Sequence, residues 1–254
     1  MEDFWNKPDL FINTGSHMYG CSNMQSDFDR RGFVIEHAEY LLGRNNFNQY
    51  ENKNEDIVIW GFSNFIYQLT KGSPNIFELL FAPKNKILQI TDAGEYLLDN
   101  KNLFISKKQV IPIAGFAHSE WLKSQLKTKD KKINNTYSNV ENIGKKRKDS
   151  YEKYGYSLKN AYHAVRLLGQ GKELAENGFI TFPRPDADLL IDIRSGLLTF
   201  ERVEAIVEKR DRELMIAIDN TKLKKQPDIK KIDELYYDLI SEKITNFFEK
   251  RKLL

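Results

Sequence analysis

One stretch, residues 11–35, constrains the fold of this chain more than any other part of its sequence. It reads FINTGSHMYGCSNMQSDFDRRGFVI and begins with the apolar end of a predicted strand. Gly15 permits a tight turn and a close approach of the backbone to a ligand. A short helix is expected next, and a second strand is expected to open at Asp27 and to continue through residues 32–35. The stretch therefore predicts strand, turn, short helix and strand in immediate succession.

Two carboxylates at the start of the second predicted strand indicate metal binding. Asp27 and Asp29 are two positions apart, so on a strand both would project from the same face. A divalent cation relieves the repulsion between them, and Mg²⁺ is usually held by a few carboxylates together with substrate phosphates. Gly15 and Ser16 would present backbone N–H groups that suit a phosphate. The alternative is an ordinary turn in which the aspartates cap the local backbone.

The motifs around these residues resemble a known signature. G-S-x-x-x-G at residues 15–20 and S-D-x-D at residues 26–29 are similar to the signature of the DNA polymerase β-type nucleotidyltransferase superfamily. The closer resemblance is to the predicted nucleotidyltransferases called RlaP or YcgL-like, found in bacteria and phages. These proteins also carry a P-N-x-x-E-L-L-F segment, here residues 74–81, and a late S-L-K-x-A-x-H-x-x-R-L-L helix, here residues 157–168. The four segments occur in one collinear order.

The resemblance implies an enzyme that transfers a nucleoside monophosphate from a nucleoside triphosphate to an acceptor hydroxyl, with loss of pyrophosphate. Asp27 and Asp29 would be catalytic and would bind Mg²⁺ or Mn²⁺, while Gly15 and Ser16 would bind the β and γ phosphates. Because RlaP-like proteins are associated with RNA repair, the favoured acceptor is an RNA 3′ end. Two alternatives stay open: nucleotidylation of a protein hydroxyl, and an inactive protein that only binds RNA or nucleotide.

A third carboxylate is expected, because the superfamily usually sets one on a strand beside the aspartate pair. Residues 56–60, DIVIW, predict a strand from their β-branched and apolar side chains. Asp56 is therefore the first candidate for a catalytic and metal-binding residue, and Glu55 is the second. Glu78 is a further candidate because it lies in a matching segment. The structural alternatives are a solvated strand end for the first two residues and a buried hydrogen-bonding role for Glu78.

The late helix places three polar residues on one face. Lys159, His163 and Arg166 stand at positions i, i+4 and i+7 of a helix for which Ser157 is the expected N-cap. Such a row suits a triphosphate or an RNA backbone. Spacing alone favours a half-buried histidine with two surface bases. The resemblance implies instead that these three residues bind the nucleotide.

Residues 123–148 are the outlier in composition. They hold nine Lys or Arg residues against Asp130 and Glu141. One interpretation is a solvated linker between two lobes. The other is an arm that contacts nucleic-acid phosphates and supplies affinity without base specificity. The candidate nucleic-acid-binding residues are Lys145, Lys146, Arg147 and Lys148.

Composition bounds the remaining possibilities. The single cysteine, Cys21, excludes an internal disulfide framework and suits a reducing cytosol. The N-terminus lacks the pattern of a signal peptide, and no apolar run approaches the roughly 20 residues that span a bilayer. A cytoplasmic protein with no membrane partner is therefore expected.

Strand signals come early in the chain and helix signals come late. This order predicts an α+β fold: a polymerase-β-like nucleotidyltransferase sheet followed by a C-terminal helical lobe. The expected divisions are a catalytic domain over residues 1–122, a basic linker over 123–150 and a helical substrate-binding lobe over 151–254. Residues 39–54 are expected to form a loop or a short irregular helix. Further helices are expected at residues 63–71, 114–126, 199–220 and 232–251.

Overall fold

The computed structural model describes residues 3–43, 46–125 and 145–252. In this part of the chain, contacts divide the residues into two compact units. Unit 1 comprises Met1–Gln109, Ile180–Pro185 and Leu223–Leu254, and unit 2 comprises Val110–Phe179 and Asp186–Lys222. The predicted domain boundaries stay a prediction, because most of the basic segment between them lies outside the described residues.

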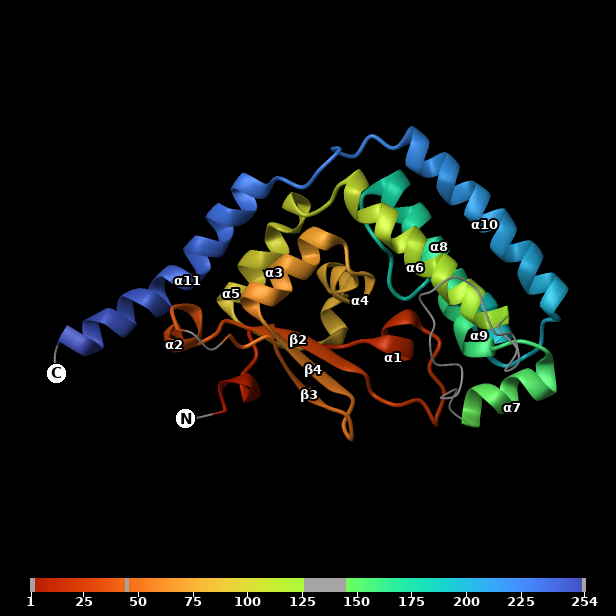
Figure 1. Cartoon of the computed structure of the whole chain (residues 1–254), viewed down its shortest axis with the longest axis horizontal. Coiled ribbons are helices and arrows are strands. Elements are labelled where there is room, and N and C mark those ends of the chain that lie inside the picture. The colour runs from red at the N-terminus through yellow and green to blue at the C-terminus, as the bar shows by residue number, and fades with distance from the viewer. Residues whose placement is uncertain (1–2, 44–45, 126–144, 253–254) are drawn as a thin grey trace. The chain divides into compact units, whose positions relative to one another are not determined.

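Unit 1 is built on a mixed sheet of five strands in its described part (Figure 1). The spatial order is β3-β4-β2-β1-β5. The neighbours β2 and β4 run parallel, and the other neighbouring pairs are antiparallel. The strands are β1 (Leu10–Asn13), β2 (Arg30–Val34), β3 (Gln49–Asn52), β4 (Ile57–Gly61) and β5 (Ile87–Ile90). A sheet early in the chain with helices late in it confirms the predicted α+β class.

Apolar side chains from β1 and β2 pack against a helix. Leu10 and Ile12 of β1 are fully buried, and the ring of Phe33 in β2 lies 5.3 Å from that of Phe62 and 4.7 Å from that of Phe65. Both of these partners belong to α3 (Phe62–Lys71), whose apolar stripe gives it an inward face. The buried rings therefore fix the sheet edge from which the candidate site is built.

The remaining helical elements of unit 1 are short, except for the last. They are η1 (Phe4–Asn6), α1 (Gly15–Tyr19), α2 (Ala38–Leu41), α3 (Phe62–Lys71), α4 (Pro74–Phe77), η2 (Glu78–Phe81), η3 (Lys84–Lys86), α5 (Asp92–Asp99), η4 (Lys101–Leu103) and α11 (Ile229–Lys252). The helix α6 (Lys107–Gln125) begins in unit 1 and continues into unit 2.

Unit 2 contains the helices α7 (Lys145–Tyr154), α8 (Leu158–Asn177), α9 (Ala187–Arg194) and α10 (Phe200–Asn220). The predicted N-cap Ser157 is confirmed, since its hydroxyl accepts a hydrogen bond from the backbone N–H of Asn160. Thr199 caps α10 in the same way. Gly171 of α8 lies close to Leu214 of α10: a Cβ added at this glycine would stand 3.2 Å from the leucine side chain.

Four expectations about element boundaries need correction. The second strand begins at Arg30, so Asp27 and Asp29 precede it instead of lying within it. The segment expected to be a loop or irregular helix contains both α2 and the edge strand β3, whose polar sequence QYEN gave no apolar signal. The helix expected at residues 63–71 is α3, which begins one residue earlier, with Gly61 at its N-cap position. The helix expected at residues 114–126 is α6, which begins at Lys107 despite the proline inside it.

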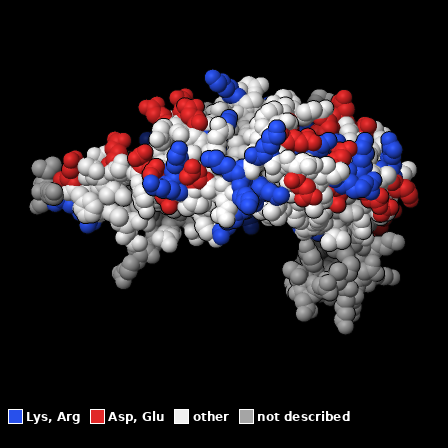
Figure 2. All heavy atoms as spheres, turned by 90° about the horizontal axis from the view of Figure 1, so that it is seen from above, with Lys and Arg blue, Asp and Glu red and all other residues white. Residues whose placement is uncertain are grey.

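Charges of both signs share the exposed helix surfaces. Figure 2 shows acidic and basic side chains interspersed over the face seen from above. On α10, for example, Glu213 lies 3.0 Å from Lys172 and 3.9 Å from Lys209. Among the described residues, no helix has the length and apolar character that crossing a membrane requires.

Candidate active site

The turn after β1 brings Gly15 against Asp29. Gly15 has a φ of +61°, and a Cβ placed on it would lie 1.9 Å from Oδ2 of Asp29. The preceding residue, Thr14, donates two hydrogen bonds to the Asp29 carbonyl oxygen: from its backbone N–H at 2.7 Å and from its hydroxyl at 3.0 Å. Both the backbone conformation and the lack of space therefore require glycine. The Asp29 carboxylate lies directly at the start of α1, as do Gly15 and Ser16.

A second carboxylate reaches the same sheet edge through strand pairing. Arg30 of β2 is paired in register with Ile57 of β4, and these two strands are parallel. Asp29 and Asp56 each immediately precede their strand, so the register brings the two residues to neighbouring positions. The Asp56 backbone has a φ of +52°, and its carbonyl oxygen accepts a hydrogen bond of 2.9 Å from the Arg30 N–H.

Arg31 lies between these two carboxylates. Its Nη2 atom is 2.9 Å from Oδ1 of Asp56 and 3.5 Å from Oδ1 of Asp29. Its Nη1 atom also donates to the Asp56 carbonyl oxygen at 2.5 Å. This guanidinium offsets the repulsion that the two acids would otherwise exert on each other. Arg31 was not among the predicted site residues, although it occupies the arginine position of the S-D-x-D-x-R-G motif that the RlaP-like proteins carry, here residues 26–32.

The other predicted acids lie in different surroundings. Asp27 is exposed, and Glu55 forms an exposed ion pair with Arg30 at 3.5 Å. Glu78 is buried and accepts a 2.7 Å hydrogen bond from the Tyr19 hydroxyl at the end of α1. This contact agrees with the structural alternative for Glu78: it anchors α1 to the segment at residues 74–81.

The acids of the site suit a hard metal ion in their chemistry. Carboxylate oxygens are the donors that Mg²⁺ and Mn²⁺ prefer, and Mg²⁺ often takes only one or two carboxylates plus phosphates. Asp29 offers such an oxygen beside the glycine turn. In the described residues, no group of three or more His, Cys, Asp or Glu side chains is close enough to hold a metal ion. The donors that do lie there therefore fit a cation shared with a phosphate ligand.

An aromatic pair that the sequence analysis missed stands beside these acids in the chain. The rings of His17 and Phe28 are stacked, with centroids 4.2 Å apart and planes inclined by 4°. Nε2 of His17 lies 3.4 Å from the Ser26 carbonyl oxygen. Phe28 keeps 56% of its surface exposed. The sequence signal that could have pointed to this pair is the phenylalanine that lies between Asp27 and Asp29.

The three candidates on α8 belong to unit 2 and differ from one another in exposure. Lys159 is exposed, His163 is partly buried, and Arg166 is buried and donates to Oε1 of Gln170 at 3.0 Å. Burial, together with the charges of Arg166 and Lys159, lowers the pKa of His163 from 6.5 to about 3. His163 is therefore neutral at physiological pH. The helix thus presents two cations and one uncharged imidazole.

The basic cluster predicted to bind nucleic acid begins α7. The side chains of Lys145, Lys146, Arg147 and Lys148 lie outside the described residues.

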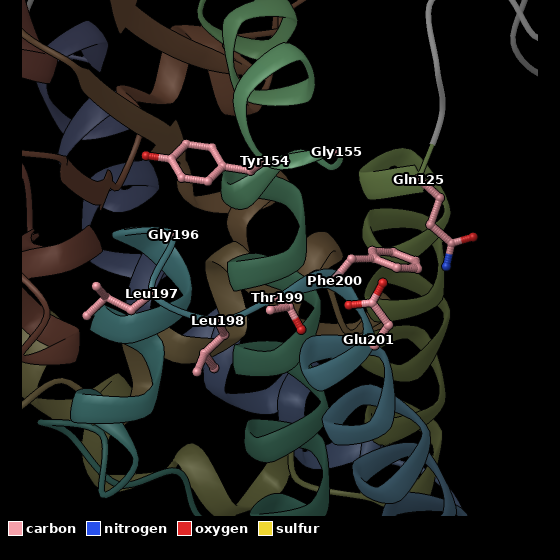
Figure 3. A pocket seen from close by; sticks show the side chains of 9 residues that line it. All are labelled: Gln125, Tyr154, Gly155, Gly196, Leu197, Leu198, Thr199, Phe200 and Glu201. Atoms are coloured by element: carbon pink, nitrogen blue, oxygen red, sulfur yellow. The ribbon is translucent and has the colours of Figure 1, made fainter.

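Unit 2 also contains an open pocket of about 550 Å³ (Figure 3). Tyr154 comes from α7, Phe200 stands at the start of α10, and the Tyr154 ring lies against Gly196. The other lining residues are Gln125, Gly155, Leu197, Leu198, Thr199 and Glu201. Among the described side chains, no predicted site residue lines this pocket, so the pocket gives no support to the predicted chemistry.

The mixed sheet, the glycine turn at Asp29 and the helical region after the sheet together define a polymerase-β-like nucleotidyltransferase fold. A family model described as "RlaP: RNA repair pathway DNA polymerase beta family" matches residues 10–238. The chain therefore belongs to this family, which confirms the resemblance seen in the sequence. No curated protein and no solved structure matches the chain. Membership implies a nucleotidyltransferase with a nucleoside triphosphate substrate, in the context of RNA repair.

Proposed function

We propose that this protein transfers a nucleoside monophosphate from a nucleoside triphosphate to the 3′-hydroxyl of RNA and releases pyrophosphate. The observation that carries the proposal is the contact between the Asp29 carboxylate and the Gly15 turn. A carboxylate oxygen, a donor that Mg²⁺ prefers, therefore lies directly beside the glycine turn that would hold the phosphates. The bond formed joins the acceptor oxygen to the α-phosphorus, and the bond broken releases the β and γ phosphates together.

The glycine turn and the acids would act on different parts of the nucleoside triphosphate. Gly15 and Ser16 would hold the β and γ phosphates, which become the leaving group. Asp27 and Asp29 would hold Mg²⁺ or Mn²⁺ near the α-phosphate. The bound metal would lower the pKa of the acceptor hydroxyl and neutralise charge on the pyrophosphate. Catalysis would then rest on positioning and electrostatics, without a covalent enzyme intermediate.

Asp56 is our candidate for the third acid of the site. The parallel pairing of β2 and β4 supports this assignment, because it brings Asp56 to the strand position beside Asp29. The Asp56 side chain keeps 48% of its surface exposed although it contacts Arg31. Arg31 would hold both acids in place before substrate binds. It would act as a positioning residue, since its contacts are with the carboxylates.

The residues of unit 2 would bind the nucleotide and the RNA. Lys159 and Arg166 would offset phosphate charge, whereas the neutral His163 would contribute a hydrogen bond. The cluster at residues 145–148 would contact RNA phosphates, and its removal should flatten the salt dependence of RNA binding.

A labelling experiment tests the reaction directly. The full chain is incubated with each α-³²P-labelled nucleoside triphosphate, Mg²⁺ or Mn²⁺, and a short RNA or the matching DNA. The double variant Asp27→Ala/Asp29→Ala should lose transfer, whereas Asp233→Ala, an exposed acid on α11, should keep it. Mutation of residues that only support a metal's ligands already lowers activity roughly 10- to 100-fold, so loss of the ligands themselves should exceed that range.

Each outcome decides between the stated alternatives. Label in RNA that depends on the two aspartates supports the proposal. Label on a protein hydroxyl would replace RNA with a protein acceptor. Absence of label under every condition, with nucleotide bound equally by both variants, would leave a binding protein and overturn the reaction.

A further inference from the structure

Phe28 combines three features that a core phenylalanine does not have. It stands between Asp27 and Asp29 in the chain, so its backbone is part of the candidate catalytic segment. The residue is 56% exposed, although Phe is among the residues most often fully buried. The ring is nonetheless held in a defined orientation by its stack on His17.

The stack leaves Phe28 with one covered face and one open face. The two rings are nearly parallel, at 4° and 4.2 Å between centroids, so the imidazole covers one flat side of the phenyl ring. His17 is partly buried, and its Nε2 atom lies 3.4 Å from the Ser26 carbonyl oxygen, which supports the imidazole from the loop that leads to Phe28. The exposed area of Phe28 then belongs to the opposite side of the ring. A supported aromatic ring with an open face is the arrangement on which nucleobases stack.

We propose that the open face of Phe28 is a stacking subsite for a nucleobase of the substrate, with His17 as the residue that positions the ring. This inference rests on the proposed function, and it adds a subsite to it. Asp29 is the next residue in the chain, so the subsite would belong to the candidate catalytic segment. The base belongs either to the incoming nucleoside triphosphate or to the 3′-terminal nucleotide of the acceptor RNA. Stacking tolerates every base, so this subsite supplies position and affinity without sequence preference.

Equilibrium binding tests the subsite without requiring catalysis. The full chain is titrated, with Ca²⁺ in place of Mg²⁺ to prevent turnover, against two pairs of probes. The first pair is each nucleoside triphosphate and ribose 5-triphosphate, which lacks the base. The second pair is a 5′-labelled single-stranded RNA with a normal 3′-terminal nucleotide and the same RNA with an abasic 3′ end.

Three substitutions of Phe28 separate stacking from simple apolar bulk. Phe28→Ala removes the ring, Phe28→Leu keeps apolar volume, and Phe28→Tyr keeps the aromatic face. Tyr67→Ala is the matched control, since Tyr67 on α3 is also 56% exposed. Thermal unfolding of all variants checks that the exposed substitutions leave the fold intact.

The expected result is a loss of affinity that depends on the base. Phe28→Ala should weaken binding of one base-bearing probe by roughly 5- to 100-fold and leave its base-free partner unchanged, with Phe28→Leu nearly as weak and Phe28→Tyr close to the parent. The affected pair identifies whose base is stacked. Equal affinities of Phe28→Ala and the parent for all four probes, or full retention by Phe28→Leu, would overturn the subsite.

Failure of this subsite and failure of the proposed reaction remain distinguishable. The labelling experiment with the aspartate variants measures nucleotidyl transfer, whereas the titrations in Ca²⁺ measure binding affinity and so test stacking. An active parent enzyme whose binding ignores Phe28 would refute the subsite alone. An inactive parent that still prefers base-bearing probes through Phe28 would refute the reaction alone.

Discussion

The edge of the sheet in unit 1 and the face of α8 in unit 2 differ in how repulsion between neighbouring ionisable groups is reduced. Both gather ionisable side chains that would repel one another if left uncompensated. At the sheet edge, Asp29 and Asp56 are compensated by an opposite charge, Arg31. On α8, by contrast, His163 lies near Arg166 and Lys159 and is neutral, because burial and those charges lower its pKa to about 3.

The origin of the two arrangements also differs. The α8 row follows from the spacing of residues along a single capped helix, so it is local in sequence. The sheet-edge cluster requires the register of β2 against β4 and the fold of the turn onto Asp29. Substitutions at the sheet edge should therefore disturb geometry, while replacing His163 on α8 should mainly change proton binding.

The sharpest test of this difference is Gly15→Ala. The new Cβ would meet the Asp29 carboxylate at 1.9 Å and would hold alanine at a φ of +61°. We expect nucleotidyl transfer to be lost and the free energy of unfolding to fall by about 1–3 kcal/mol, as measured by denaturant titration. Gly115→Ala is the control, since that glycine lies in α6 with nothing within 4 Å of the added Cβ. It should raise the free energy of unfolding by about 0.5–1 kcal/mol. Equal effects would show that Gly15 has no special constraint.

The histidine of α8 should make stability depend on pH. Its pKa is about 3 in the folded chain, below the ordinary value of 6.5, so between these values the unfolded chain binds more protons. Stability is therefore present above pH 6.5 and is lost as the pH falls toward 3, with a limiting slope of about 1.4 kcal/mol per pH unit. In urea titrations from pH 7 to pH 4, His163→Gln should reduce this slope. The exposed His118 provides the control, and a slope lowered equally by His118→Gln would contradict the assignment.

The smallest expected effect concerns neighbouring arginines of β2. Arg31→Gln removes the guanidinium between two acids, and we expect the free energy of unfolding to fall by about 1 kcal/mol. Arg30→Gln removes the exposed pair with Glu55 and a 3.2 Å hydrogen bond to the Glu55 carbonyl oxygen, and its effect should stay within about 0.5 kcal/mol. Denaturant titrations at low and high salt compare the two variants. Indistinguishable values would mean that Arg31 does not organise the site.

Local sequence patterns predicted much of this molecule. The glycine turn, the strand at Ile57–Gly61, the cap at Ser157 and the helices α8 and α10 depend on residues close together in the chain, and all are present. The motif order also identified the family that the comparison confirmed. The catalytic and binding roles of individual residues remain predictions.

Contacts between distant segments could not be predicted in the same way. The polar edge strand β3, the Tyr19–Glu78 hydrogen bond and the Arg31 bridge all depend on how separate segments pair. A short polar strand carries no apolar periodicity, and an acid looks the same in sequence whether it binds a metal, an arginine or a tyrosine. Only the packing of the separate segments against one another distinguishes these cases.

The sequence by itself determined the type and order of the main elements and the chemistry available in the segment around Gly15 and Asp29. That information is local, because backbone freedom and side-chain periodicity act over a few residues. The tertiary structure decided which acids became neighbours, which cation compensated them and which aromatic ring remained open. Those outcomes depend on packing and strand register between residues far apart in the chain, where small differences in contact free energy select one arrangement.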